Sequence, residues 1–181
     1  EDLKLELPAE SDEEVVEEEE KEEEEFFVDA DFTIDATDST AWIYFDLTSG
    51  TIIEPNTPED STEWDLKFQR YDIGVNGGVS GTAGVMVAFE EGVYDSFDDI
   101  TVIPERSWHT DTEDTDDDGK PEYAIKDWFD YDISTHVLTP KNIVYFIQTS
   151  EYSYKFRIVD YYGPSGASGY MSFDITQMNA E

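Results

Sequence analysis

Two stretches near the C-terminus decide the fold class: YKFRIV at residues 154–159 and YMSFDI at residues 170–175. Much of each stretch alternates apolar and polar side chains, which is the period of a strand with one buried face. Glycines and a proline lie between the two stretches, in residues 160–169, and are typical of a connection between antiparallel strands. The pair therefore predicts two strands whose apolar faces pack on a core.

The same pattern recurs along the chain, while the 3.6-residue period of a helix is nearly absent. Further short runs rich in β-branched and aromatic residues are FVDADFTID (27–35), AWIYFDL (41–47) and IVYFI (143–147). We predict an all-β protein of packed antiparallel sheets. Trp42 and Trp64 are expected to fill the core between the sheets. Arg70, with Asp65 and Asp72 nearby in the sequence, is expected to form a structural ion pair.

The chain of 181 residues holds 46 acidic and 10 basic residues, a formal net charge of −36. This balance excludes binding to a nucleic-acid backbone, which depends on basic residues that neutralise phosphates. It equally excludes electrostatic attachment to an anionic membrane surface. An acidic surface with few lysines fits a protein that works in high salt, where repulsion between the charges is screened.

The charge is densest at the N-terminus, where residues 1–25 hold 15 acidic and two basic residues. Like charges at this density repel one another and disfavour a helix. We predict a disordered acidic linker or tail over 1–25, followed by a single domain over 26–181. A docking strip for a basic or calcium-loaded partner is the alternative for the tail.

Known catalytic motifs find little support in the sequence. No cysteine is present, which excludes disulfides, zinc ribbons, iron–sulfur sites and thiol nucleophiles. No G-x-S-x-G motif accompanies the two histidines, so serine hydrolase chemistry lacks its usual signature. The glycine-rich stretch 74–81 is not followed by the lysine of a phosphate-binding loop and predicts a turn instead. We expect a protein that is not an enzyme.

The sharpest local signal is DTDDDGKPE at residues 114–122. Alternate carboxylates at Asp114, Asp116 and Asp118 can converge on one hard cation, and Glu122 is placed to complete the set. The position at which an EF-hand has its bidentate glutamate is Ile125, so the loop is not a full EF-hand. Calcium binding and a solvated acidic loop remain the two interpretations.

A family resemblance rests on residues already quoted. The order WIYF (42–45), Gly50, WD (64–65), RYDI (70–73) and the glycine-rich stretch resembles the HmuY family of haem-binding proteins. VYFI (144–147), KFRI (155–158), DY (160–161) and SF (172–173) continue the order. The resemblance covers roughly residues 38–175 and is weaker between about 90 and 127.

The resemblance implies an all-β, non-catalytic protein on the outer surface of a Gram-negative bacterium. Members of this family are secreted or tethered to the outer membrane as lipoproteins, capture haem or a porphyrin and pass it to an outer-membrane receptor. A membrane contact would then come only from a lipid anchor already removed from this sequence. The alternative function is a calcium-binding adhesion or protein-interaction module on the same fold, without haem.

The family holds haem iron between two axial ligands, histidine in one case and methionine in others. The resemblance therefore points to His109 and His136 as the candidate pair, with His109 in the less similar middle region and His136 in the loop after Trp128 and before the expected strand at 143–147. An imidazole nitrogen is a sound donor to haem iron. Trp108 and Trp128 flank this variable part and are expected either to line a ligand slot or to pack in the core.

Overall fold

The computed structural model describes residues 30–92 and 96–178, which form eleven strands and no helix. The predicted all-β class is therefore confirmed. The predicted acidic linker over 1–25 lies outside the described residues. Within those ranges, no helix long and apolar enough to cross a membrane was found.

The larger sheet contains five strands in the order β1-β11-β10-β9-β6, and every neighbouring pair is antiparallel. Its strands are β1 (Ala30–Asp35), β6 (Met86–Glu91), β9 (Ile143–Gln148), β10 (Ser153–Tyr162) and β11 (Ser168–Met178). The two stretches that decided the fold class are β10 and β11, and they pair directly, with Phe156 opposite Ile175.

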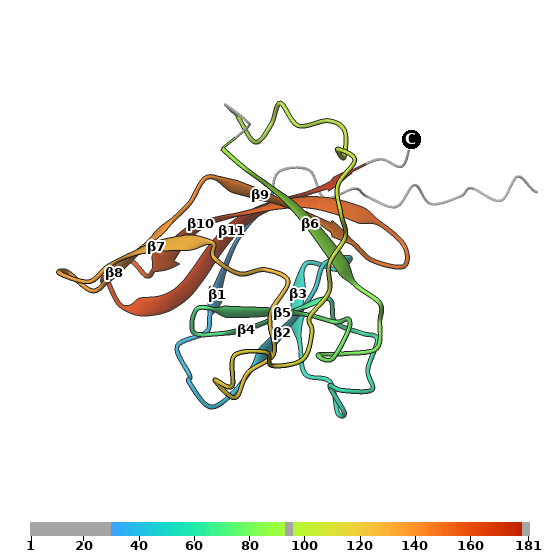
Figure 1. Ribbon diagram of the computed structural model, residues 1–181, viewed down its shortest axis with the longest axis horizontal. Coiled ribbons are helices and arrows are strands. Elements are labelled where there is room, and N and C mark those ends of the chain that lie inside the picture. The colour runs from blue at the N-terminus through green and yellow to red at the C-terminus, as the bar shows by residue number, and fades with distance from the viewer. Residues whose placement is uncertain (1–29, 93–95, 179–181) are drawn as a thin grey trace, which may run out of the picture.

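The smaller sheet contains four strands in the order β3-β2-β4-β5. These are β2 (Ile43–Asp46), β3 (Thr51–Ile53), β4 (Leu66–Gln69) and β5 (Asp72–Val75). A separate hairpin joins β7 (Phe129–Asp132) to β8 (Val137–Pro140). Figure 1 shows the larger sheet above the smaller one, with the hairpin extending to the left of both.

The main core lies between the two sheets and is built largely of aromatic rings. Phe173 on β11 is fully buried and its ring contacts four other phenylalanines. Two of these rings, Phe45 and Phe68, belong to the smaller sheet, and the other two, Phe32 and Phe156, belong to the larger one. One side chain of the C-terminal strand therefore joins both layers.

Two expectations about single residues are decided by the packing. Trp64 is fully buried but is not part of the core between the sheets, because its ring packs against Tyr44, whereas Trp42 is only partly buried and packs edge-on against Tyr123. Arg70 does not form the expected ion pair. Its guanidinium donates to the carbonyl oxygens of Thr37 and Ser168, both at 3.1 Å, because these turns meet at its side chain.

A long connection between β6 and β7 carries most of the candidate site residues, and residues 96–128 of it contain no strand. Lys155 fixes its first part to the outer face of the larger sheet by donating to the carbonyl oxygens of Phe97 and Ile100. Isolated bridges fix the rest: His109 to Val87, Thr112 to Glu122 and Ile125 to Ile73. The connection is therefore held at several points without being a strand.

Candidate functional site

Asp111 anchors the β6–β7 connection to the smaller sheet. Its side chain is only 1% exposed, and its two carboxylate oxygens accept hydrogen bonds from the backbone amides of Val75 (3.0 Å) and Ala124 (2.8 Å). Burial raises the pKa of this carboxyl, and these backbone hydrogen bonds oppose the shift. A single buried carboxylate therefore holds both arms of the connection against β5.

Gly78 allows the close approach that this anchor needs. Its φ is 62°, and a Cβ at this position would lie 1.8 Å from the backbone oxygen of Asp111. Glycine adopts the left-handed conformation without strain, and it has no Cβ that would collide with the Asp111 backbone. The glycine-rich stretch is thus a turn, as predicted from the sequence. Its close approach to the backbone of Asp111 allows the Asp111 carboxylate to reach β5.

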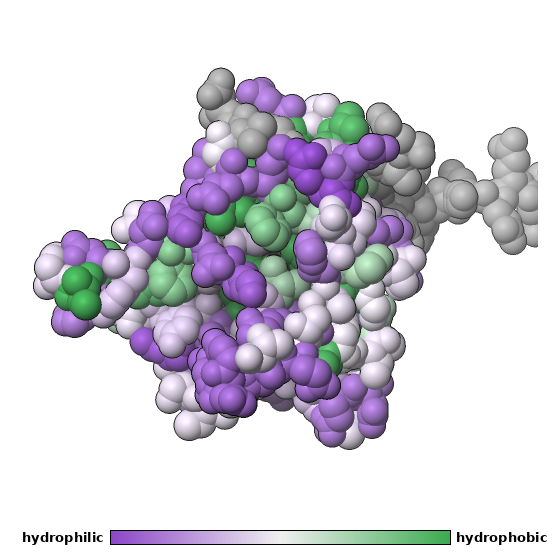
Figure 2. Space-filling model, in the orientation of Figure 1, coloured by the Kyte–Doolittle hydropathy of each residue, from purple (hydrophilic) through white to green (hydrophobic). Residues whose placement is uncertain are grey.

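The anchored connection, β6 and the residues before β9 enclose a cavity of about 570 Å³. Figure 2 shows this face of the molecule, where pale green side chains lie at the centre within a largely purple surround. The lining combines apolar and aromatic side chains with basic and acidic ones: Phe89, Glu91, His109, Thr110, Thr112, Glu122, Tyr123, Ala124, Lys126, Asp127, Lys141 and Ile143. We refer to this space as the His109 cavity.

His109 occupies a fixed place on the cavity wall. Its backbone exchanges two hydrogen bonds with Val87, at 2.8 and 2.7 Å, so the residue extends the edge of the larger sheet beyond β6. The imidazole is exposed, and its ring centroid lies 6.4 Å from that of Phe89, which is itself 48% exposed. An accessible nitrogen donor beside an accessible aromatic ring suits a flat aromatic ligand.

Two lysines line the same cavity. Lys126 pairs with Glu122 at 3.2 Å. Lys141 lies in the turn before β9 and has no ion pair among residues 30–92 and 96–178. Its ammonium group is therefore available to an anionic group of a ligand.

Tyr123 also lines the cavity, and tyrosine is one of the side chains that can serve as an axial ligand of haem iron. Burial raises the pKa of its phenol well above the usual value, and the negative charges of Asp72, Asp111 and Asp118 add to the shift. The phenol stays protonated at neutral pH, whereas a tyrosine that ligates iron does so as a phenolate. His109 is the donor that the electrostatics of this cavity favour.

The structure does not bring the two predicted histidines to the same cavity. His136 lies at the turn of the β7–β8 hairpin with a φ of 58°, and its Nδ1 is 2.5 Å from the Tyr131 hydroxyl. It is not among the residues that line the His109 cavity. The hairpin end is also apolar, since Ile133 is 79% exposed, and Figure 2 shows green side chains there.

The two predicted tryptophans lie in packed surroundings. Trp128 is 2% exposed, belongs to the main core and donates its indole N–H to the Tyr71 carbonyl oxygen at 3.0 Å. Trp108 is partly buried against the smaller apolar cluster on the outer face of the larger sheet. Neither side chain lines the His109 cavity.

The acidic loop brings three of its four predicted ligands together. One carboxylate oxygen from each of Asp114, Asp116 and Asp118 lies within 4.8 Å of the others, and all three side chains are exposed. Glu122 is directed elsewhere, because its carboxylate accepts hydrogen bonds from Thr115 and Lys126. Asp114 accepts from the Gly119 amide at 2.8 Å, so the loop is already closed by its own backbone.

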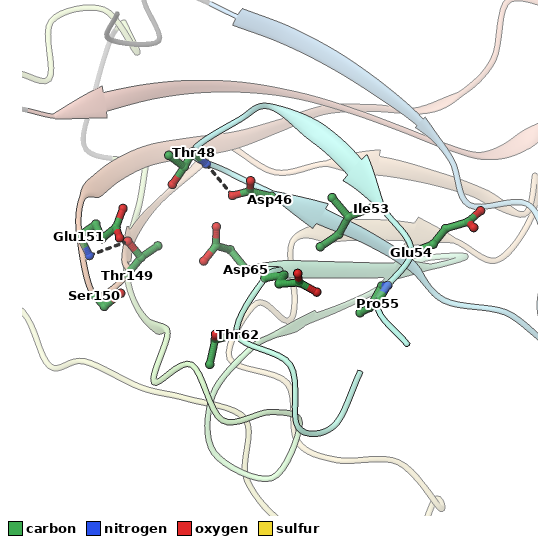
Figure 3. Close-up of a pocket in the computed structure, with 11 residues that line it drawn as sticks. Asp46, Thr48, Ile53, Glu54, Pro55, Thr62, Asp65, Thr149, Ser150 and Glu151 are labelled. Carbon is green, nitrogen blue, oxygen red and sulfur yellow. Dashed lines mark hydrogen bonds between the residues drawn. The ribbon is translucent and has the colours of Figure 1, made fainter. Parts of the chain in front are cut away.

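A second cavity, of about 580 Å³, lies where the two sheets meet at the β9–β10 turn. Its lining comes from the end of β2, from residues 53–55 and 62–65, and from residues 149–151 (Figure 3). Five of the lining side chains are carboxylates, and none is basic: Asp46, Glu54, Glu63, Asp65 and Glu151. We refer to it as the acidic cavity.

Asp65, on the wall of the acidic cavity, makes the stability of the folded protein depend on pH. Burial raises the pKa of its carboxyl from 3.8 to about 6, and the charges of Asp46 and Glu151 add to the shift. Because the folded chain then holds this proton more tightly than the unfolded chain, the stability from Asp65 is complete below about pH 4. It is lost as the pH rises through about 6.

Asp65→Asn keeps an acceptor for the Leu47 amide but does not titrate. We expect the free energy of unfolding of this variant to gain about 3 kcal/mol relative to wild type between about pH 3.5 and pH 7. Urea unfolding of both proteins across this pH range measures the difference. The other acids are the same in both proteins, so their titration cancels in that difference. A difference that does not change with pH would contradict the raised pKa.

Comparisons with known proteins place this geometry in a family. The sequence model described as HmuY protein matches residues 38–175. A structure from Bacteroides vulgatus ATCC 8482, provisionally described as an HmuY-like heme-binding protein, is 21% identical with a TM-score of 0.61. The match covers 84% of this chain and 93% of that one. The apo HmuY analog of Tannerella forsythia is 14% identical with a TM-score of 0.65, over 84% and 97% of the chains.

A third structure, from Bacteroides fragilis NCTC 9343 and provisionally described as a lipoprotein, is 24% identical with a TM-score of 0.61. It matches over 84% of this chain and 92% of that one. At these identities the structures show a shared fold. No curated protein matches the chain. The family match covers most of the chain, including the smaller sheet and four of the five strands of the larger one in whole or in large part, so the protein belongs to the HmuY family.

Proposed function

We propose that the protein binds haem or a related porphyrin in the His109 cavity, as a non-catalytic carrier at the bacterial surface. The observation that carries this proposal is the meeting of an accessible imidazole, an accessible phenylalanine ring and Lys141 in one cavity of about 570 Å³. His109 would supply an iron ligand, Phe89 a face for the ring, and Lys141 a partner for a propionate. Haem, when bound, would supply an iron atom that can accept a nitrogen ligand.

Membership of the HmuY family supports the same proposal, as do the neighbours described as a heme-binding protein and a lipoprotein. A lipid-anchored protein of the outer membrane that passes its ligand to a receptor is the cellular role we infer. The acidic N-terminal segment fits a spacer between such an anchor and the domain.

Haemin titration followed by the Soret band tests the proposal, in dilute buffer and in molar NaCl. We expect a saturable, red-shifted band at one equivalent for wild type. His109→Ala should lose the red shift, because it removes the donor on the cavity wall, and His136→Ala is the matched control. Loss of the shift in both variants would show that the hairpin supplies a second axial ligand.

Metal-free protoporphyrin separates ring binding from iron ligation. We expect its fluorescence change to survive in His109→Ala and to weaken in Lys141→Gln, since one substitution removes an iron donor and the other a partner for propionate. No saturable change with either compound, in either salt, would overturn the proposal. Calcium binding at Asp114, Asp116 and Asp118 would then be the next function to test.

A further inference from the structure

We propose that the outer edge of β7 binds an extended, basic segment of a partner protein as an additional antiparallel strand. The β7–β8 hairpin is a separate two-stranded sheet that extends from the body of the protein (Figure 1). Its β8 side faces the body, because the Leu138 amide donates to the Tyr162 hydroxyl of β10 at 2.8 Å. The other side of β7 therefore lies at the outer edge of the hairpin.

The register of the hairpin shows which backbone groups of β7 point outward. The Lys141 amide donates to the Trp128 carbonyl oxygen at 2.8 Å, so these two residues form a hydrogen-bonded pair. Bonded and non-bonded pairs alternate along an antiparallel ladder, so Asp130 is the next residue of β7 that bonds to β8. Phe129 and Tyr131 therefore direct their backbone N–H and C=O groups away from β8.

These outward groups have no backbone partner within residues 30–92 and 96–178. None of the backbone hydrogen bonds there reaches the N–H or C=O group of Phe129 or Tyr131. The β6–β7 connection closes the outer edges of β6 and β5 with bridges at Val87 and Ile73, but it forms no such bridge with β7. An open strand edge of this kind is a template for a further strand.

Apolar side chains beside the edge add to what a partner strand would gain. Tyr131 is 51% exposed, and Ile133 in the following turn is the most exposed large hydrophobic residue of the described chain. Figure 2 shows green side chains at this end of the hairpin. A strand paired with β7 would remove part of this apolar surface from water while it satisfies the backbone groups.

Two carboxylates specify the charge of the partner. Asp130 and Asp132 are exposed and, two positions apart on a strand, lie on the same face of β7. Asp130 forms no ion pair in the described part of the chain. Hydrogen bonds from Ser134 lower the pKa of the Asp132 carboxyl, so it is charged at neutral pH. Lysine or arginine at alternate positions of the added strand would lie opposite both charges.

The same carboxylates disfavour a second copy of this chain as the partner. If the β7 strands of two copies paired with Tyr131 opposite Tyr131, Asp130 of each copy would lie opposite Asp132 of the other. Like charges directly opposite each other destabilise a strand pair, and charged side chains on an edge strand protect against self-association. The edge thus rejects copies of the chain and accepts a strand of opposite charge.

A capped heptapeptide that alternates lysine with valine tests the proposal on the whole chain, at physiological ionic strength. We expect saturable one-to-one binding by calorimetry, with NMR shifts confined to residues 128–140. The same peptide N-methylated at its valines keeps every charge but loses the backbone donors that would face Tyr131. It should bind at least about tenfold more weakly. Equal binding of the two peptides would overturn the proposal, because attraction would then come from charge alone.

Matched charge reversals locate the site. Asp130→Lys should weaken binding of the lysine–valine peptide at least about threefold, because it sets like charges opposite each other. Asp60→Lys reverses an exposed charge in the segment between β3 and β4 and should leave binding unchanged. Equal losses in the two variants, or NMR shifts scattered over acidic surfaces, would contradict a site at β7.

Sedimentation velocity of the chain alone tests the other occupant. We expect a monomer, and a dimer that dissociates when the lysine–valine peptide is added would assign the edge to a second copy and overturn the proposal. Asp130 does not line the His109 cavity, so haemin binding should be unchanged in Asp130→Lys. The strand edge and the proposed haem site can therefore fail independently.

Discussion

Phe173→Ala is expected to lower the free energy of unfolding by about 3–5 kcal/mol, a loss typical of a buried phenylalanine replaced by alanine. The ring stacks on Phe68 with centroids 5.5 Å apart and also touches Phe32, Phe45 and Phe156. Removing it leaves a cavity at the point where the two sheets meet, which neighbouring rings cannot fill without leaving their own contacts.

Thermal and urea unfolding measure this loss, which corresponds to a fall in melting temperature of roughly 6–20 °C for a chain of this size. Phe173→Leu is the matched control, because it keeps most of the apolar volume and should lose far less. Near-wild-type stability of the alanine variant would mean that the sheets are not joined at this ring.

Asp111→Ala is expected to cost about 2–6 kcal/mol, because it leaves the buried amides of Val75 and Ala124 without an acceptor. It also removes the negative charge near Lys67. The variant should release the wall of the His109 cavity as well as lower global stability. Hydrogen exchange of residues 109–125 should rise more than that of β10 and β11, and haemin affinity should fall.

Asp111→Asn provides the control, since its amide keeps one acceptor oxygen without the charge. We expect it to lie between wild type and the alanine variant in stability, with most haemin binding retained. If the alanine variant lost less than about 1 kcal/mol, or if its exchange rose evenly over the chain, Asp111 would not be the anchor of the connection.

The longest and most apolar strands were predictable because alternation over many residues is a strong local signal. The expected runs 143–147, 154–159 and 170–175 correspond to β9, β10 and β11, and the run 41–47 contains β2. The strands β3, β4 and β5 have three or four residues each, so alternation is too short to stand out from turns. Their pairing was decided by packing between sheets rather than by local pattern.

The β6–β7 connection was least predictable, because its structure depends on contacts between residues far apart in the sequence. Asp111 is one of 46 acidic residues and carries no local motif, yet its partners lie 36 positions before and 13 positions after it. A buried carboxylate between Thr110 and Thr112 could not be told from a solvated one. His109, by contrast, was a candidate because the family resemblance implies axial ligands and an imidazole can bind haem iron.

The ion pair expected for Arg70 was wrong for a related reason. The sequence placed Asp65 and Asp72 near it, but strand geometry directs Asp72 to Lys120 instead, in an ion pair of 2.6 Å. Arg70 has a φ of 53° and lies in the turn that connects β4 to β5. Arg70 thus belongs to neither strand, and its side chain does not follow the alternating faces of β4 and β5.

The bridge between Thr112 and Glu122 makes the tip of the loop that it closes, residues 116–119, a replaceable module, whereas Lys120 in the same loop is held by its ion pair with Asp72. Two backbone hydrogen bonds of 3.0 Å close the ends of this loop, so the chain enters and leaves it at fixed points. Changes in length or sequence inside this tip need not reach Asp111 or the cavity wall. A spectroscopic label, or the binding loop of another protein, can therefore be inserted there while the ligand site and the fold keep their geometry.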